Sequence, residues 1–393
     1  RHFWQKAATA PTAAAKADSR FAQSRRSPMT TLMLLVASTK TVRPAVQRTD
    51  VAPAAKHRSG ASKKLKQNKI KFNFTKINSQ KSDTNLSTSF IALINIFKLL
   101  FILKPKNYLI YSTSDLFWET IPAFLNRKHN HWVQIIHHLY PDWKKRPGSF
   151  FNNFFGFYLQ QFSLRLIKNA HLIIVINPLV KQKLIKQYHF DPKKIFLSSN
   201  GINLNKVTKN PIRYQAVCVG RLDHSKGLND FVPIWRRVCQ IYPQAKLALI
   251  GSSSNPDNIS SLKSQIKNNH LQQNIDVLGY LDDQKMKHIL SSSQIFITPS
   301  HEEGWGIAIA EAMFHQLPVV CWNLKNLKSI YQQHIFTAPL NNYSKFSHQI
   351  IKLLDKPKTA QRLGQDNTKF IRQFSWRKVA LTEFNILSQL QPN

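Results

Sequence analysis

The chain has 393 residues, and at ~150 residues per domain this length allows about two domains. Hydrophobic residues make up 42% of the sequence, enough to form cores, so the chain is not disordered throughout. Its 56 Lys and Arg against 19 Asp and Glu give a net charge of +37. This charge predicts an anionic partner: nucleic acid, an anionic membrane or a phosphorylated substrate. No uninterrupted run of ~20 apolar residues occurs, which excludes a bundle of membrane-spanning helices.

The cysteines argue against a disulfide scaffold and against a zinc site. Only Cys218, Cys239 and Cys321 occur, an odd number of widely spaced residues. We therefore expect buried thiols and a reducing, cytoplasmic compartment.

The composition changes abruptly near residue 62. Residues 1–61 contain 14 alanines, whereas the other 332 residues contain 12. Residues 1–61 also lack Asn, Ile, Tyr and Glu and show no sustained period, which predicts a disordered or foreign tail. The one apolar run there, Leu32–Ala37, is too short and too far into the chain for a signal peptide.

The segment Phe90–Leu103 is strongly apolar, but Asn95 and Lys98 interrupt it. It is either a core helix of the first domain or a surface that touches a membrane.

Short apolar runs alternate with amphipathic segments through the rest of the first half. The runs predict buried strands at Tyr108–Tyr111, Val133–Ile136, Leu172–Ile176 and Ile195–Leu197. Helices are expected between them at Phe151–Ile167 and Leu179–Gln187.

The same rhythm restarts after Pro211. Strands are expected at Ala216–Val219, Leu247–Ile250, Ile275–Leu278, Ile295–Thr298 and Val319–Trp322. Helices are expected at 228–242, 257–268, 283–291 and 306–315. Alternating strands and helices form βαβ units, so the chain is predicted to be α/β, with two Rossmann-like, doubly wound domains facing across a cleft. Ligands of such sheets bind at the carboxyl ends of the strands, which places the site in that cleft.

The segment Gly220–Gly227 follows a predicted strand and precedes a predicted helix. Arg221 and Lys226 flank the turn, and the helix N-terminus points into it. Two cations and a positive helix end suit a diphosphate without a metal ion, although two solvated surface charges are an equal alternative.

The segment from Pro299 to Ala312 concentrates carboxylates at another strand end. The chain has five glutamates, and three of them lie between Glu302 and Glu311. Glu303 lies in a Gly-Trp-Gly turn, and Glu311 lies in the following helix. Carboxylates accept hydrogen bonds from vicinal hydroxyls, so this pair suits a sugar or a ribose. Helix N-terminal charges are the ordinary alternative, but they do not explain the glycines.

Together the two segments resemble the family 4 retaining glycosyltransferases, which have the GT-B fold. The family's E-x7-E motif is matched by Glu303 and Glu311. Ile135–Leu139 resembles the strand that carries the family's active-site histidine, and Phe374–Trp376 resembles the start of its final helix. The resemblance covers roughly residues 85 to 393.

The resemblance implies a role for each matched position. Arg221 and Lys226 would hold the diphosphate of a nucleotide sugar, and Glu311 would bind the ribose. Glu303 would contact the donor sugar and act in catalysis, with His138 or, less favoured, His137 facing it. The remaining donor-binding positions would be Asn200, Gly201, Gly279, Tyr280, Gly304, Trp305, Gly306 and Ile307.

The mechanism that the resemblance implies is transfer with retention at the anomeric carbon. Arg221 and Lys226 would stabilise the charge that develops on the departing diphosphate. The leaving phosphate would take the proton of the acceptor hydroxyl. No Asp-x-Asp pair occurs, so we expect neither a metal nor another cofactor.

Two features depart from the family. No glycine occurs between Ser62 and Tyr108, where the family has a Gly-rich loop, so the first domain is expected to be incomplete. His315 and Gln316 stand where the family often has Gly.

The expected organisation is a tail at 1–61, an acceptor-side domain at 62–205, a nucleotide-sugar domain at 206–375, and a helix at 376–393 that crosses back. The expected partners are a nucleotide-diphosphate sugar, a sugar or lipid-linked acceptor and an anionic membrane surface. The expected location is the cytoplasm, either free or peripheral on the inner face of a membrane. A basic nucleic-acid-binding protein and an inactive glycosyltransferase fragment are the alternatives. The first lacks support because no nucleic-acid-binding motif occurs and the basic residues are spread throughout.

Overall fold

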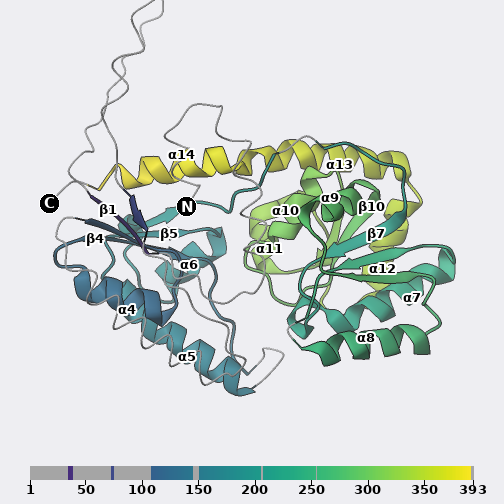
Figure 1. Ribbon diagram of the computed structural model, residues 1–393, viewed down its shortest axis with the longest axis horizontal. Helices are drawn as coiled ribbons and strands as arrows, with labels where there is room; N and C mark the ends of the chain where they lie inside the picture. The colour runs from purple at the N-terminus through teal and green to yellow at the C-terminus, as the bar shows by residue number, and fades with distance from the viewer. Residues whose placement is uncertain are drawn as a thin grey trace, which may run out of the picture.

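The computed structural model describes residues 34–38, 72–74, 108–144, 150–204, 207–253 and 255–390. These residues form two α/β halves, each built around a six-stranded sheet (Figure 1). The predicted fold class, two Rossmann-like halves of the GT-B type, is confirmed. Among the described helices, none is long and apolar enough to cross a membrane.

The first sheet has the strand order β2-β1-β3-β4-β5-β6. Its strands are β1 (Leu34–Ser38), β2 (Phe72–Phe74), β3 (Tyr108–Ser112), β4 (His131–Ile136), β5 (Leu172–Val175) and β6 (Ile195–Leu197). From β3 to β6 each strand is parallel to the next, as the alternating pattern predicts. These strands are apolar and largely buried, as expected for a sheet covered on both faces.

The two leading strands differ from the sequence expectation. β1 pairs antiparallel with β3, with Leu35 opposite Tyr111, and β2 pairs antiparallel with β1. The apolar run expected in a tail outside the fold therefore contributes a strand, and the sheet is mixed. An apolar strand satisfies the backbone groups that β3 would otherwise expose at an edge. Phe90–Leu103 and the glycine-free stretch before Tyr108 lie largely outside the described residues.

The helices of the first half are α4 (Phe117–Asn126), α5 (Phe150–Ile167) and α6 (Pro178–Lys186). Figure 1 shows α4 and α5 together below the sheet. Between sheet and helices lies an apolar core that includes Trp132, Ile173 and Leu164.

The second sheet is wholly parallel, in the order β12-β11-β10-β7-β8-β9. Its strands are β7 (Tyr214–Val219), β8 (Leu247–Ile250), β9 (Ile275–Gly279), β10 (Ser293–Thr298), β11 (Val319–Trp322) and β12 (Phe336–Ala338). This is the doubly wound order, in which the chain reverses direction across the sheet between β7 and β10. The carboxyl ends of these two neighbouring strands are therefore the expected ligand position.

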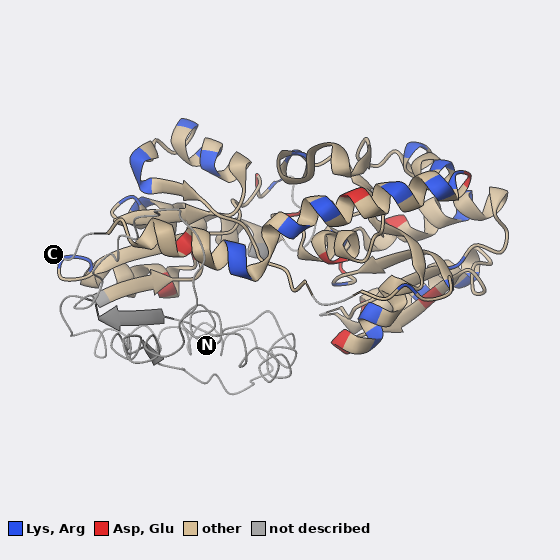
Figure 2. Cartoon of the chain, turned by 90° about the horizontal axis from the view of Figure 1, so that it is seen from above, with Lys and Arg blue, Asp and Glu red and all other residues tan. Residues whose placement is uncertain are grey.

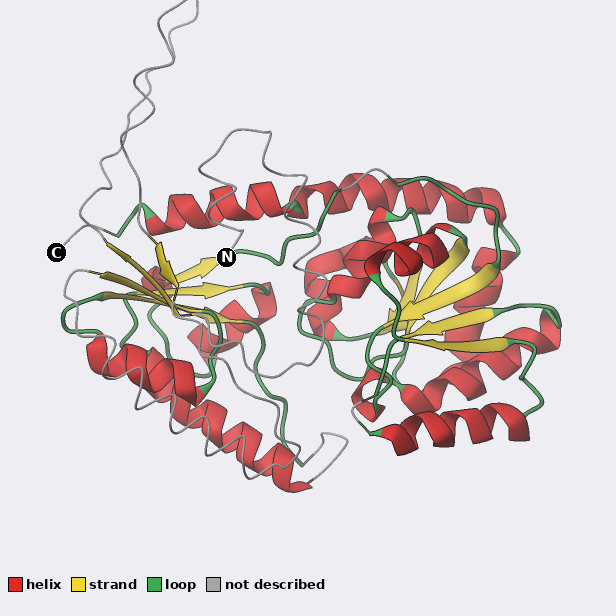
Figure 3. Cartoon of the chain, in the orientation of Figure 1, coloured by secondary structure: helices red, strands yellow, loops and turns green. Residues whose placement is uncertain are grey.

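Helices cover both faces of this sheet (Figure 3). They are α7 (Phe231–Ile241), α8 (Pro256–Asn268), α9 (Asp283–Ser291), α10 (Ile307–Phe314), α11 (Lys325–Tyr331), α12 (Tyr343–Leu354) and α13 (Pro357–Ile371). The helix expected from residue 228 starts three residues later, after a 3-10 turn at Leu228–Asp230. Gly227, directly before this turn, has a left-handed backbone (φ +76°), which glycine adopts without a steric penalty.

The last helix, α14 (Trp376–Leu387), begins where the family resemblance implied and returns to the first half. Ser375 caps it by accepting the Lys378 amide. On the first half, Glu383 accepts hydrogen bonds from the hydroxyls of Tyr111 (2.8 Å) and Ser198 (3.0 Å). In Figures 1 and 2, α14 lies along the first half and follows α13, which lies along the second. Figure 2 also shows Lys and Arg distributed over both halves.

Candidate functional site

The loops that follow β7 and β10 pack directly against each other. The amide of His301 donates to the carbonyl of Ser225 at 3.0 Å. A Cβ added at Gly227 would lie 2.0 Å from the carbonyl oxygen of Pro299, so only glycine fits this contact. The sheet order therefore brings together two segments that are about 75 residues apart in sequence.

An ion pair joins these loops at the centre of the site. Nζ of Lys226 lies 2.6 Å from Oε1 of Glu303, and the hydroxyl of Ser300 donates to the same oxygen at 3.1 Å. The side chains of Lys226 and Glu303 are 23% and 16% exposed, so the pair is partly shielded from water. Oε2 of Glu303 has no hydrogen-bond partner among the described residues and can accept one from a ligand.

Arg221 lies at the open side of the same turn. Its guanidinium donates to Asp223 at 3.0 Å but remains 53% exposed. Asp223 is in turn held by the hydroxyl of Ser253 at 2.7 Å. A Cβ added at Gly220 would meet nothing within 4 Å, so a ligand can approach this backbone closely.

The strand ends beside Gly220 are also crowded with glycine. A Cβ at Gly251, which follows β8, would lie 1.7 Å from the Gly220 carbonyl oxygen. The Gly251 amide donates to the carbonyl oxygen of Gly279 at 2.8 Å, and Gly279 adopts a φ of +66°. Tyr280 next to it is 49% exposed. The three glycines thus stack at the ends of β7, β8 and β9 and leave an accessible aromatic side chain at the rim.

The first half holds the Glu303 loop through Asn177. The Asn177 amide donates to the Gly304 carbonyl at 2.7 Å, while its oxygen caps α6 by accepting the Leu179 amide. Asn326 fixes the neighbouring peptide by donating to the Glu303 carbonyl at 2.8 Å. These contacts set the position of Glu303 relative to the first half.

The two candidate histidines differ in their surroundings. His137 donates from Nε2 to the Thr113 carbonyl at 2.8 Å, and burial lowers its pKa, which keeps the ring neutral. His138 instead lines the cleft. A Cβ added at Gly304 would lie 3.4 Å from the Cβ of His138. His138 therefore faces the Glu303 loop, whereas His137 anchors the strand end.

A buried carboxylate supports the loop to which His137 is anchored. Glu119 accepts from the amide and the hydroxyl of Ser114, both at 2.9 Å. Burial raises the pKa of Glu119 to about 7, although these hydrogen bonds oppose the shift. The sequence analysis did not single out Glu119, since its role depends on the loop folding back over it.

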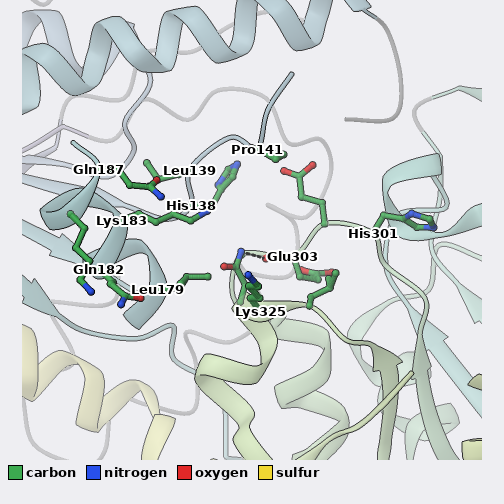
Figure 4. Close-up of a pocket in the computed structure, with 15 residues that line it drawn as sticks. His138, Leu139, Pro141, Leu179, Gln182, Lys183, Gln187, His301, Glu303 and Lys325 are labelled. Atoms are coloured by element: carbon green, nitrogen blue, oxygen red, sulfur yellow. Dashed lines mark hydrogen bonds between the residues drawn. The ribbon is translucent and has the colours of Figure 1, made fainter. Parts of the chain in front are cut away.

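A pocket of about 550 Å³ opens between the two halves at this point (Figure 4). Its walls include His138 from the first half and Glu303 and Gly304 from the second. Its volume is within the range of small-molecule binding sites. Among the described residues, no group of three or more His, Cys, Asp or Glu side chains is placed to hold a metal ion.

Other predicted donor positions fall on α10 and its approach. Gly306 precedes α10 in a left-handed conformation (φ +79°), and Ile307 begins the helix 46% exposed. Glu311 lies half-buried on α10, the helix that follows the Glu303 loop. Trp305 is 3% exposed and packs on Tyr331, so its indole belongs to the core.

Asn200 and Gly201 lie at the crossing to α14. A Cβ at Gly201 would lie 2.3 Å from the Trp376 indole, and Ile202 pairs with Ser375. This packing explains a glycine at 201 without a ligand. The structure thus joins Lys226, Glu303, Gly304 and His138, whereas Gly201 packs against Trp376.

Two family models match consecutive parts of the chain. The model described as Glycosyltransferase Family 4 matches residues 83–206, and the model described as Glycosyl transferases group 1 matches residues 201–370. The chain belongs to the group 1 glycosyltransferases. The nucleic-acid-binding alternative finds no support in these matches.

Curated relatives of this glycosyltransferase family member are distant. A poly(glycerol-phosphate) alpha-glucosyltransferase of Bacillus subtilis is 26% identical over 56% of this chain and 32% of its own length. An O-antigen chain mannosyltransferase B of Escherichia coli is 21% identical over 58% of this chain and 63% of its own. The chain therefore spans less than two thirds of either relative.

Solved glycosyltransferases share the fold. Anabaena HepE in complex with UDP and glucose matches with a TM-score of 0.64 and 16% identity, covering 79% of this chain and 84% of its own. A mutant of S. aureus TarM, in complex with fondaparinux, alpha-GlcNAc-glycerol and UDP, matches with a TM-score of 0.62 and 18% identity. The match covers 75% of this chain and 58% of the TarM chain.

One residue that holds the Glu303 loop gave no sequence signal. Asp230 is buried and accepts from Nε2 of His301 at 2.7 Å, from the Trp322 indole at 3.0 Å and from the Tyr343 hydroxyl at 3.3 Å. It fixes the loop that carries Glu303. Asn177 did have a signal, because Asn followed by Pro before a helical run is typical of a helix start.

Proposed function

We propose that the chain transfers a sugar from a nucleoside-diphosphate donor to a hydroxyl group of a glycan or lipid-linked acceptor, with retention of anomeric configuration. The observation that carries the proposal is the Lys226–Glu303 pair at the switch point of the second sheet, opposite His138. Family membership and UDP in the neighbours HepE and TarM support a nucleotide donor.

In this proposal the donor lies along the strand ends of the second half. Arg221 and Lys226 bind the diphosphate, with the open backbone at Gly220 beside it. Glu311 on α10 accepts from the ribose hydroxyls, and Tyr280 lies near the base. The unpartnered Oε2 of Glu303 accepts from a hydroxyl of the donor sugar.

The proposed chemistry develops charge at both ends of the breaking bond. The anomeric carbon acquires oxocarbenium character, and the departing diphosphate gains negative charge. Two fixed cations aimed at that phosphate lower the barrier because they stabilise the transition state more than the ground state. The leaving phosphate accepts the proton of the acceptor hydroxyl on the same face, so the site works without a metal ion.

We further propose that the protein works at the cytoplasmic face of an anionic membrane. The outward side of α5 is a stripe of exposed apolar side chains at helical spacing: Phe151 (69%), Phe155 (58%), Tyr158 (50%), Leu159 (42%) and Phe162 (46%). The polar residues Asn153, Gln160 and Ser163 of the same helix are buried instead. This reversed pattern costs stability in water and suits insertion between lipid headgroups, to which the net charge of +37 adds attraction.

The test measures binding of UDP, GDP and ADP by calorimetry to Arg221→Gln and Lys226→Gln variants, with and without EDTA. Loss of a charge-assisted contact predicts binding weaker by roughly 1.5–3 kcal/mol for each variant, and no effect of EDTA. Lys285→Gln is the matched control, because Lys285 is 72% exposed and its ion pair is with Asp282, three residues earlier in the chain.

Lys226→Gln also leaves Glu303 without its cation, so the double variant Lys226→Gln/Glu303→Gln separates the two effects. The double variant is expected to remain weak in nucleotide binding. Loss of binding on chelation, with both single variants equal to wild type, would overturn the site. An inverted anomeric configuration in the product, determined by NMR, would overturn retention.

A further inference from the structure

The interdomain pocket contains lysines that donor binding does not use. Lys183 and Lys186 enter it from α6 of the first half, and Lys325 enters it from the start of α11 of the second half. In Figure 4, Lys183 lies on the His138 side and Lys325 on the Glu303 side. The three cations thus come from both walls of one cavity.

The charge of this pocket is unbalanced. In the described part of the chain no carboxylate forms an ion pair with Lys183, Lys186 or Lys325. Of the two glutamates in the lining, Glu303 is already neutralised by Lys226 at 2.6 Å. The other is Glu302, so the lining holds three lysines outside any described ion pair against one carboxylate outside the Lys226 pair. An excess of lysines around a cavity raises the local concentration of anions.

Ordinary helix stability does not explain the whole set. Lys183 and Lys186 lie in the last turn of α6, where a cation is favourable against the helix dipole. Lys325 is the first residue of α11, which has no side-chain cap, and a cation at that end is unfavourable. Its position at the pocket therefore has no stabilising reason within its own helix.

The face of α6 toward the pocket also has a composition that is typical of a ligand-binding surface. Leu179, Gln182, Lys183 and Lys186 recur at helical spacing along it, whereas Val180 and Leu184 are buried on the other side. Apolar contacts come from Leu139 and Leu324. Cations, an amide and apolar side chains together suit an organic molecule that carries phosphate and hydroxyl groups.

We propose that this pocket binds the acceptor, and that the acceptor carries a phosphate group held by Lys183, Lys186 and Lys325. The proposal rests on the proposed sugar transfer. His138, Glu303 and Gly304 belong to both the pocket and the expected position of the donor sugar. A phosphate anchored on the lysines therefore places a hydroxyl of the same molecule beside the anomeric carbon. Lysine suits this role because its ammonium binds phosphate as a point charge.

The experiment measures binding of glycerol 3-phosphate to the full chain by calorimetry, with glycerol as the uncharged counterpart. The tightest-binding of UDP, GDP and ADP is present at saturation, so the donor site is filled. Binding of glycerol 3-phosphate to the triple variant Lys183→Gln/Lys186→Gln/Lys325→Gln is expected to be weaker by about tenfold or more. Nucleotide binding is expected to be unchanged, which also shows that the variant is folded.

The matched control removes three charges from the same region outside the pocket, in Lys181→Gln/Lys193→Gln/Lys328→Gln. This control is expected to bind glycerol 3-phosphate within about twofold of wild type, because screened surface charges contribute little. Equal weakening in both triple variants, or no binding to wild type, would overturn the proposal. Failure of every nucleotide to bind would instead contradict the donor site, and the glycerol 3-phosphate comparison would still decide the pocket.

Vesicles of phosphatidylglycerol distinguish a soluble phosphate from a lipid headgroup. The pocket triple variant is expected to bind such vesicles as the control does. Weaker vesicle binding together with unchanged glycerol 3-phosphate binding would overturn the proposal, because the lysines would then contact the membrane surface rather than an acceptor.

Discussion

Gln316 has a left-handed backbone, with a φ of +61°, just after α10. The Gln316 amide donates to Met313 and the Leu317 amide donates to Ala312, both at 3.1 Å. This pattern is a Schellman motif, whose left-handed position favours glycine. It gives a physical reason for the glycine that the family often has here.

Gln316→Gly is therefore expected to stabilise the protein. Relief of left-handed strain, ~1–2 kcal/mol, exceeds the entropy that glycine adds to the unfolded chain, ~0.5–1 kcal/mol, so the net gain is roughly 0.5–1 kcal/mol. Urea denaturation measures it as a higher midpoint at unchanged slope. Gln316→Ala keeps the strain and is the control; an equal gain in both variants would contradict this explanation.

Glu119 is expected to make stability depend on pH. Its folded pKa of about 7 lies above the ordinary value of 4.5, so the folded state holds the proton more tightly. The resulting stability is complete below pH 4.5 and is lost as the pH rises through 7. The loss amounts to about 3 kcal/mol at full ionisation.

Glu119→Gln has no proton to lose and keeps the acceptor for Ser114. We expect its Tm to be close to that of wild type near pH 4.5 and higher near pH 8, as followed by thermal denaturation. A constant difference between the two proteins across this pH range would show that Glu119 is ionised in both states.

At the scale of elements, α5 places its aromatic side chains outward and its amides inward. The inward Gln160 donates to Asp115 at 2.6 Å and accepts the Tyr140 amide at 2.7 Å. The inward side of α5, which also contributes Leu164 and Ile167 to the apolar core, therefore builds the first half, and the exposed apolar side is left for a partner.

Phe151→Ser/Phe155→Ser/Phe162→Ser is expected to reduce binding to vesicles that contain phosphatidylglycerol. Each side chain loses apolar area available for insertion, at ~25 cal/mol per Å². Because these positions are exposed, the Tm is expected to stay within about 2 °C. Phe231→Leu, in the core of the second half, is the converse control, which lowers Tm without changing vesicle binding. Unchanged vesicle binding of the triple variant would refute the membrane face.

At the scale of the whole molecule, the two halves are joined by α14 and by the Asn177–Gly304 contact. Glu383 is buried in this junction and accepts from the hydroxyls of Tyr111 and Ser198. Removing its carboxylate takes a buried charged acceptor away from both hydroxyls.

Glu383→Ala is expected to destabilise the protein by roughly 2–4 kcal/mol, because two buried hydrogen bonds to a carboxylate are lost. Hydrogen exchange is expected to accelerate in β3 and α14 more than in β7 or β10, because the variant releases the helix from the first half. Glu383→Gln retains one acceptor and is expected to lose less, while Thr382→Ala, on the exposed side of α14, serves as the control. Uniform acceleration throughout the chain would contradict a local junction.

The sequence by itself determined most strands of both sheets, because runs such as Leu247–Ile250 are continuously apolar and bounded by turn residues. It also determined the segments that bear the candidate chemistry, because glycines and carboxylates cluster at their ends.

Only the tertiary structure decided which of these residues meet. The Lys226–Glu303 pair, the cleft-facing position of His138 and the packing of Gly201 under Trp376 each depend on strand order or on a returning helix. β1 was missed for the same reason, since a short apolar run becomes a strand only when another strand offers it an edge. Such contacts join residues far apart in the chain, and no local pattern encodes them.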